Sequence, residues 1–174
     1  MDSVKKIISK YKKDRTRLID ILKDIQAEEG HVSEQAIRAL ATSLKISRAE
    51  IEGVISFYHF LADRPLGGYV IYLNNSITSE MAGRETVAKV LEKEAGCHFG
   101  ETSPDGLITL LETSCIGMND QEPAAIINGV IFTSLNEEKV KKIVARMKEK
   151  RDVQSMVEEY GDGANQHELV RAMV

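Results

Sequence analysis

Cysteine is scarce in this sequence, since only Cys97 and Cys115 occur among 174 residues. There is no C-x2-C pair, and a thioredoxin-type redox site requires a C-x-x-C pair at the start of a helix, where the thiol pKa falls. A zinc site would have to combine Cys97, His98 and Cys115 with a fourth ligand from His31, His59 or a carboxylate, which is not a usual ligand spacing. We therefore expect no metal centre, no thiol–disulfide chemistry and, in a reducing compartment, no structural disulfide.

Long apolar runs are also missing. The first residues, MDSVKKIISKYKK, have neither an apolar core of signal-peptide length nor a small-residue cleavage site. The longest apolar stretch, residues 124–132, is interrupted by Asn128-Gly129 and is too short to span a bilayer. We expect a cytoplasmic protein with no direct membrane insertion.

Positive charge is not in excess, because 23 Lys and Arg face 27 Asp and Glu, for a formal net charge of −4. This balance disfavours nucleic acid and anionic lipid as partners. Glycine-rich nucleotide loops are absent as well: Gly67-Gly68 is a linker, and neither G-x-G-x-x-G nor G-x4-G-K-[ST] occurs. The sequence thus gives the chain itself no evident NAD or flavin site.

The sequence is 43% hydrophobic, enough for a folded core, and helical periodicity fills its first third. The basic run 5–17 predicts a helix with a solvated face. A helix from Arg15 should stop at Gly30, and Ser33 should cap the next. The capping box Ser47-Arg48-Ala49-Glu50 should begin a third helix that carries Tyr58 and Leu61. His59 would then be a helical histidine among core aromatics, packed or at an interface rather than catalytic.

The helical pattern breaks at Arg64-Pro65-Leu66-Gly67-Gly68, and short strands then alternate with helices. We predict strands at 69–73, 107–112, 124–127 and 130–132, a polar loop at 74–78, and helices at 79–94 and after Asn136. Asn128-Gly129 predicts a tight hairpin. The fold class is therefore α/β, with an N-terminal helical bundle (1–64), a thioredoxin-like α/β domain with a small mixed sheet (67–149) and a C-terminal tail (150–174). We expect the charged tail to order only against a partner.

Several stretches resemble one family in the same order. The run Gly30–Leu61 is similar to the helical N-terminal part of the 24-kDa-type (E-type) subunit of NADH dehydrogenase, a thioredoxin-like two-iron two-sulfur ferredoxin. Later, Gly100-Glu101-Thr102, Asp105-Gly106 and Thr109-Leu110 resemble that family's approach to its second pair of cluster cysteines, and Cys115, Gly117 and Pro123 continue in register. The resemblance covers roughly Arg15 to Met147.

The resemblance implies four cluster cysteines, spaced C-x4-C after the first strand and C-x3-C in a later loop. Those positions fall on Asn74, Ser79, Cys115 and Asn119, so three of four thiolates are missing, and Cys97 matches no ligand position. Each iron needs two strongly donating ligands besides its bridging sulfides, and neutral asparagine or serine does not replace thiolate. We therefore expect no cluster, a residual buried or half-buried thiol at Cys115, and polar side chains that hydrogen-bond one another around water.

The family also implies a function. The chain is expected to be a non-catalytic, cluster-less subunit of a soluble NAD(P)H-linked flavin/iron–sulfur oxidoreductase of the NADH dehydrogenase, hydrogenase, formate dehydrogenase or bifurcating type. Its expected partners are a flavoprotein subunit carrying FMN and the NAD(P)H site, bound mainly by residues 1–64, and further iron–sulfur subunits. Two alternatives stay open. One is an electron-transfer subunit with an unusually ligated two-iron cluster, and the other is a freestanding thioredoxin-fold adaptor.

Overall fold

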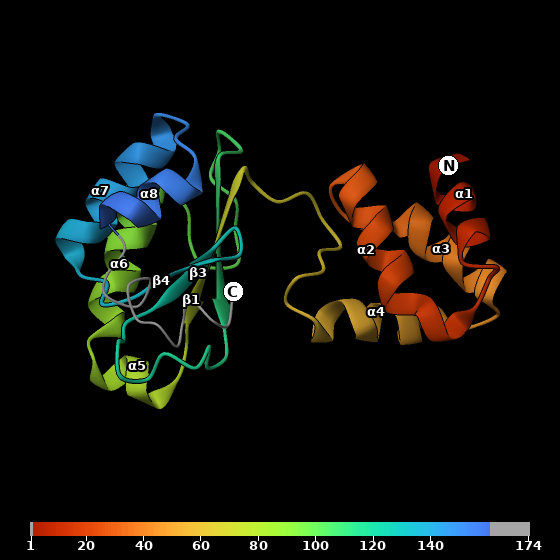
Figure 1. The fold of residues 1–174 in the computed structure, drawn as a ribbon, viewed down its shortest axis with the longest axis horizontal. Coiled ribbons are helices and arrows are strands. Elements are labelled where there is room, and N and C mark those ends of the chain that lie inside the picture. Colours follow the sequence, from red (N-terminus) through yellow and green to blue (C-terminus); the bar gives the residue numbers. More distant parts are fainter. Residues whose placement is uncertain (1, 161–174) are drawn as a thin grey trace. The chain divides into compact units, whose positions relative to one another are not determined.

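The structure, a computed structural model, describes residues 2–160 of the chain. It contains two compact units, one formed by residues 1–66 and one that begins at Gly67. Figure 1 shows the first as a group of helices and the second as a sheet with helices. Each unit is described by itself below.

The helical unit is built from short helices whose starts and stops have local causes. Asp14, Ser33 and Ser47 each accept a hydrogen bond from a backbone amide at the start of a helix, and Gly30 ends another in the left-handed conformation. The caps predicted at Gly30, Ser33 and Ser47 are confirmed. The elements are α1 (Asp2–Lys10), η1 (Arg15–Arg17), α2 (Leu18–Glu29), α3 (Glu34–Leu44) and α4 (Arg48–Phe57).

This unit has its own apolar core. The lysines of α1 are exposed to solvent, as the predicted solvated face requires. Fully buried members of this core are Ile21, Leu22, Ile25, Leu40 and Ile51. Burial of these side chains, rather than helix propensity alone, stabilises helices as short as these.

The prediction for the end of α4 is wrong. The helix stops at Phe57, and Tyr58 adopts an extended conformation, with φ −95° and ψ 107°. His59 is therefore not a helical residue in a core: it lies exposed in a turn, with its ring edge-on to Phe60 at a centroid distance of 5.8 Å. Leu61 is buried although it lies beyond the helix. Tertiary burial of Leu61 produced the apolar periodicity that resembled a longer helix.

The second unit is a mixed four-stranded sheet with helices. Its strand order is β2-β1-β3-β4, with β1 and β2 parallel and the other neighbours antiparallel. Figure 1 shows α6, α7 and α8 together on one face of this sheet. The predicted α/β class is confirmed. The elements are β1 (Tyr69–Asn74), α5 (Ile77–Met81), α6 (Arg84–Ala95), β2 (Ile108–Thr113), β3 (Ala125–Ile127), β4 (Val130–Phe132), α7 (Glu137–Lys148) and α8 (Val153–Tyr160).

One local signal and two long-range hydrogen bonds place the hairpin of β3 and β4. Asn128 and Gly129 both have positive φ, as the predicted two-residue hairpin between β3 and β4 requires. The Asn128 side chain also accepts a hydrogen bond from the Val70 amide at 2.8 Å and donates one to the Gly68 carbonyl at 2.8 Å. The hairpin is thereby joined to the start of β1.

The predicted single helix over 79–94 is wrong. The chain forms a one-turn helix, α5, and then starts again at α6, because Gly83 adopts φ 94°, outside the helical range. Part of the predicted polar loop therefore lies in α5, and Asn74 is the last residue of β1. This break separates Ser79 from the helix that follows.

The expectation that the whole tail orders only against a partner is also wrong. Val153, Met156 and Val157 of α8 are buried in the core of the α/β unit, and α8 contacts β4 and α7. Tyr69 donates a hydrogen bond to the Arg151 carbonyl at 2.6 Å, which fixes the approach to α8. The rest of the predicted tail, residues 161–174, lies outside the described residues. Across residues 2–160, no helix combines the length and apolarity needed to cross a bilayer.

Candidate functional site

The predicted site lies where two connections of the α/β unit meet. One runs from the end of β1 into α5, where the Ser76 side chain caps the short helix by accepting from the Ser79 amide. The other runs from β2 to β3. Thr78 donates to the Asn119 side chain at 2.8 Å, so the two connections touch. The hydrogen bond joins segments that lie 41 residues apart in sequence.

The first two positions are inaccessible to solvent. Asn74 and Ser79 are each 0% exposed. The Asn74 amide nitrogen donates to the Glu122 carboxylate, and its backbone N–H donates to the Ala124 carbonyl at 2.9 Å. Asn74 Oδ1 and Ser79 Oγ have no hydrogen-bond partner within the part of the chain that the structure describes. An unpaired buried polar atom costs on the order of 1–3 kcal/mol, so each of these atoms destabilises the unit unless it binds a water.

The later two positions are different. Cys115 is exposed, which corrects the expectation of a buried or half-buried thiol. It lies beyond the end of β2, in a loop that turns at Gly117 with φ 85°. Its Sγ donates to Asn119 Oδ1 at 3.4 Å and accepts from the Gly117 amide at 3.5 Å. The thiol therefore belongs to the local hydrogen bonding of an exposed loop.

The polar replacements do not bond to one another as expected. Among the described residues, Asn74 pairs with Glu122, Asn119 pairs with Thr78 and Cys115, and Ser79 Oγ has no partner. The reason is depth: two positions are buried at the end of β1 and in α5, and the other two lie on an exposed loop.

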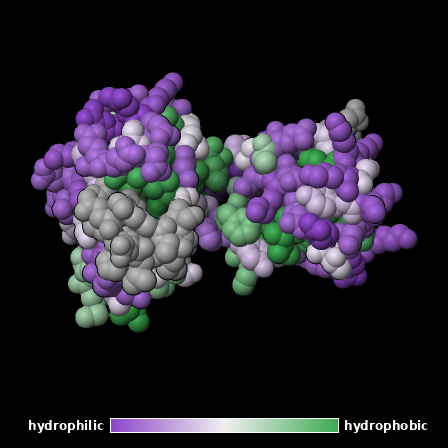
Figure 2. Space-filling model, in the orientation of Figure 1, coloured by the Kyte–Doolittle hydropathy of each residue, from purple (hydrophilic) through white to green (hydrophobic). Residues whose placement is uncertain are grey.

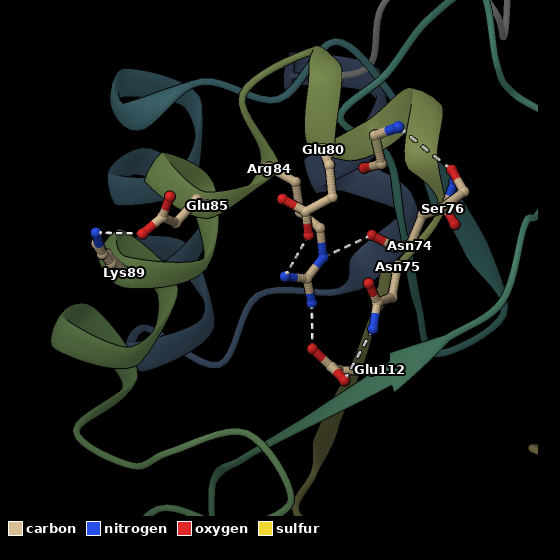
Figure 3. Close-up of polar contacts among 9 residues, drawn as sticks. Asn74, Asn75, Ser76, Glu80, Arg84, Glu85, Lys89 and Glu112 are labelled. Carbon is tan, nitrogen blue, oxygen red and sulfur yellow. Dashed lines mark hydrogen bonds and ion pairs between the residues drawn. The ribbon is translucent and has the colours of Figure 1, made fainter.

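A buried arginine next to the site was not predicted. Arg84, at the start of α6, is 7% exposed. Its Nε donates to the Asn74 carbonyl at 2.9 Å, and its other nitrogens pair with Glu80 at 3.3 Å and with Glu112 (Figure 3). The guanidinium also lies 5.7 Å from the centre of the Phe99 ring. A sequence signal existed, since a positive charge in the first turn of a helix opposes the helix dipole and so needs compensating partners.

Other polar groups flank this edge of the sheet. Asn75 Nδ2 donates to Glu112 Oε2 at 3.2 Å, and both residues line a hollow of about 310 Å3 together with Thr113 and Ser114.

Two apolar side chains of α5 are exposed near this site. Ile77 and Met81 lie one turn apart on α5 and are 80% and 84% exposed. Figure 2 shows green atoms at the foot of this unit, where α5 lies.

The remaining cysteine is unsuited to metal binding. Cys97 is buried, and its Sγ lies 3.9 Å from the Glu101 carbonyl. Burial, with smaller contributions from Glu101, Asp105 and Glu92, raises the pKa of the Cys97 thiol above its usual value. The neutral thiol is a poor metal ligand, because metals bind the thiolate.

The residues present do not fit a two-iron two-sulfur cluster. The four positions offer one thiol, two amides and one hydroxyl, while such a cluster needs four strong donors, normally thiolates. Throughout residues 2–160, no group of three or more His, Cys, Asp or Glu is arranged to hold a metal ion. The described residues of the site form hydrogen bonds and ion pairs that join β1, α5, α6 and β2.

Comparison with known proteins places the chain among relatives from redox complexes. A sequence model described as thioredoxin-like [2Fe-2S] ferredoxin matches residues 4–148. The chain is 43% identical over 175 residues to the NAD-reducing hydrogenase HoxS subunit alpha of Cupriavidus necator, covering 100% of this chain and 29% of that protein. The chain thus spans less than a third of that relative.

Two smaller relatives are matched over most of their length. The E-type subunit of NADH-quinone oxidoreductase from Buchnera aphidicola is 35% identical, with 75% of this chain and 77% of the relative covered. Its counterpart from Escherichia coli is 33% identical, with 79% and 83% covered. A crystal structure of an NAD+-reducing [NiFe]-hydrogenase in the air-oxidized state has a similar fold, with a TM-score of 0.67 at 23% identity over 81% of this chain and 25% of that one.

Proposed function

The chain belongs to the thioredoxin-like [2Fe-2S] ferredoxin family, and from that premise we propose that it is a non-catalytic, cluster-less subunit of a soluble NAD(P)H-linked flavin/iron–sulfur oxidoreductase. Its role is to bind and stabilise the flavoprotein subunit that carries FMN and the NAD(P)H site. The identity of its relatives supports this class of complex, since they belong to an NAD-reducing hydrogenase and to NADH-quinone oxidoreductases.

One observation carries the proposal: the donor set at the four family positions. Asn74 and Ser79 are fully buried and are not anionic, and Asn119 contributes a neutral amide next to the single thiol of Cys115. Neutral oxygen donors do not replace thiolates on iron, because each ferric ion requires strong anionic donors. The fold is kept while the ligands are replaced, which favours a role in assembly.

Assembly of a complex requires contact surfaces for a partner subunit rather than ligands for a metal cluster. Both units have exposed apolar side chains. Phe57 and Phe60 are exposed on the helical unit, and Ile77 and Met81 on the α/β unit. We infer that the helical unit provides most of the contact with the flavoprotein and that further iron–sulfur subunits complete the complex. A cytoplasmic location is part of the same proposal.

The first experiment is iron and acid-labile sulfide analysis, with a visible spectrum, on the chain purified anaerobically. We expect no iron, no acid-labile sulfide and no visible absorbance band in the chain itself. Two irons per chain with a reducible visible band would contradict the proposal and make the chain an electron-transfer subunit.

The second experiment identifies the partner. A tagged chain expressed in its own host should recover a flavoprotein with bound FMN and NAD(P)H-dependent activity. Cys115→Ser should leave both recovery and turnover unchanged, whereas loss of turnover in an intact assembly would indicate chemistry at the thiol. Recovery of a stable, monodisperse chain without any flavoprotein would favour a freestanding adaptor.

A further inference from the structure

Gly53 is a glycine that the helical unit does not require. It lies in the middle of α4, is exposed, and has no positive φ. A Cβ added there would meet no atom within 4 Å apart from the neighbouring backbone of α4 itself. Glycine is among the least favourable residues inside a helix, so alanine at this position would stabilise the unit. The missing side chain therefore leaves space that nothing in this unit uses.

A large aromatic side chain is exposed next to that space. Phe57 follows Gly53 by one helical turn, so the two lie on the same side of α4, and Phe57 is 79% exposed. Its ring is supported by Tyr58, edge-on at a centroid distance of 5.0 Å. Figure 2 shows pale green atoms around the C-terminal end of α4. An exposed aromatic ring beside an empty position offers a partner a large apolar contact.

Gly53 also lines a hollow on this unit. The hollow has a volume of about 510 Å3 and lies between α3, α4 and the chain that follows them. Its other lining residues are Glu34, Ile37, Glu52, Ser56 and Asp63. Its lining therefore combines an apolar residue from α3, small residues from α4 and carboxylates.

The charges of this groove indicate what could cover it. Arg38 and Arg48 pair with Glu34, and Arg48 also pairs with Glu52 at 3.0 Å. Asp63 forms no ion pair with any residue that the structure describes, and it is exposed. None of the residues lining the groove is positively charged. A partner surface of complementary charge would place a Lys or Arg side chain opposite the Asp63 carboxylate.

We propose that the groove beside Gly53 and Phe57 is the surface that binds the flavoprotein subunit. A segment of that partner passes close over Gly53, covers the Phe57 ring with an apolar side chain and places a basic side chain opposite Asp63. A second copy of this chain is a poorer occupant, because the residues lining the groove include no Lys or Arg that could meet the Asp63 carboxylate of the other copy in a two-fold contact. The inference rests on the proposed function and assigns its contact to one face of the helical unit.

The test uses the full chain and the flavoprotein recovered with it. Gly53→Ala should raise the melting temperature of the chain and weaken flavoprotein binding about tenfold or more, because a methyl group fills the path of the partner segment. Thr42→Ala, an exposed helix position on α3 outside the groove, should also favour the helix yet leave the dissociation constant unchanged. Opposite effects on stability and binding cannot arise from misfolding.

Two further variants define the contact. Phe57→Asn should weaken binding about tenfold or more without unfolding the chain, since the ring is exposed. Asp63→Lys should weaken binding and reduce its dependence on salt. If Gly53→Ala and Phe57→Asn bind the flavoprotein as tightly as the natural chain, the groove is not the contact surface, although the proposed function stands. If the natural chain recovers no flavoprotein, both proposals are wrong.

Discussion

A single arginine joins three elements around the candidate site. Arg84 begins α6, bonds to the last carbonyl of β1 and pairs with one carboxylate on α5 and one on β2. These hydrogen bonds and ion pairs join the elements that carry the two loops of the candidate site.

Arg84→Met should therefore destabilise the α/β unit. The variant loses charge-assisted hydrogen bonds to three partners, and we expect the free energy of unfolding to fall by about 1–3 kcal/mol. Urea denaturation measures this loss. Lys89→Met is the matched control on the same helix, because Lys89 pairs with the exposed Glu85 (Figure 3), and such pairs contribute about 0–1 kcal/mol. Equal effects of the two variants would contradict the role given to Arg84.

Two serines at one short helix should respond in opposite directions. Ser79→Ala removes a buried hydroxyl that has no partner among the described residues, and we expect the free energy of unfolding to rise by about 1 kcal/mol. Ser76→Ala removes the N-cap of α5 and should lower it by about 1 kcal/mol. Thermal or urea unfolding compares the pair. A loss of stability in Ser79→Ala would mean that an ordered water holds the hydroxyl.

At the level of elements, α8 belongs to the fold of the α/β unit. Met156 is 1% exposed in the main core. Met156→Ala should cost about 2–5 kcal/mol, because it removes buried methylene and thioether groups and leaves a cavity. Gln154→Ala, on the exposed side of α8, should change stability by less than about 0.5 kcal/mol. If both variants unfold at the same urea concentration as the natural chain, the core does not depend on this helix.

The elements that could be predicted from sequence are those with local causes. Ser33, Ser47, Asn128-Gly129 and Asn136 act on their own neighbours, and each has the predicted role in the structure. The end of α4 and the burial of α8 depend on contacts with distant segments, whereas the break at Gly83 has a local cause, its positive φ, that the apolar periodicity of residues 79–94 did not reveal. Apolar periodicity alone does not distinguish a continued helix from a loop that buries the same side chains.

The residues of the site divide in the same way, into features that local sequence predicts and features that depend on folding. The resemblance predicts the four positions from motif spacing along the chain. Their depth could not be predicted: Asn74 is buried and Cys115 is exposed because one ends a strand and the other lies in a loop beyond a strand. Arg84 and Glu122 join the site only through folding, from positions 10 and 48 residues away from Asn74.

At the level of the whole molecule, the chain has two separate apolar cores, one in each compact unit. We predict that a substitution that destabilises one unit leaves the stability of the other unit unchanged. Leu40→Ala removes a fully buried side chain of the helical unit and should cost that unit about 2–5 kcal/mol. Hydrogen exchange followed by mass spectrometry should show faster exchange in residues 1–66 and unchanged exchange in β1 and α6. Faster exchange in both units would indicate that the chain unfolds as one.

The unequal exposure of the two cysteines gives the protein a natural attachment point. Cys97 is buried and Cys115 is exposed, so a thiol-reactive fluorophore will label Cys115 in the folded chain without any engineering. The dye would lie in the loop that carries Asn119 and next to the hydrogen bond from Thr78. Its emission would then report when another molecule covers this edge of the α/β unit.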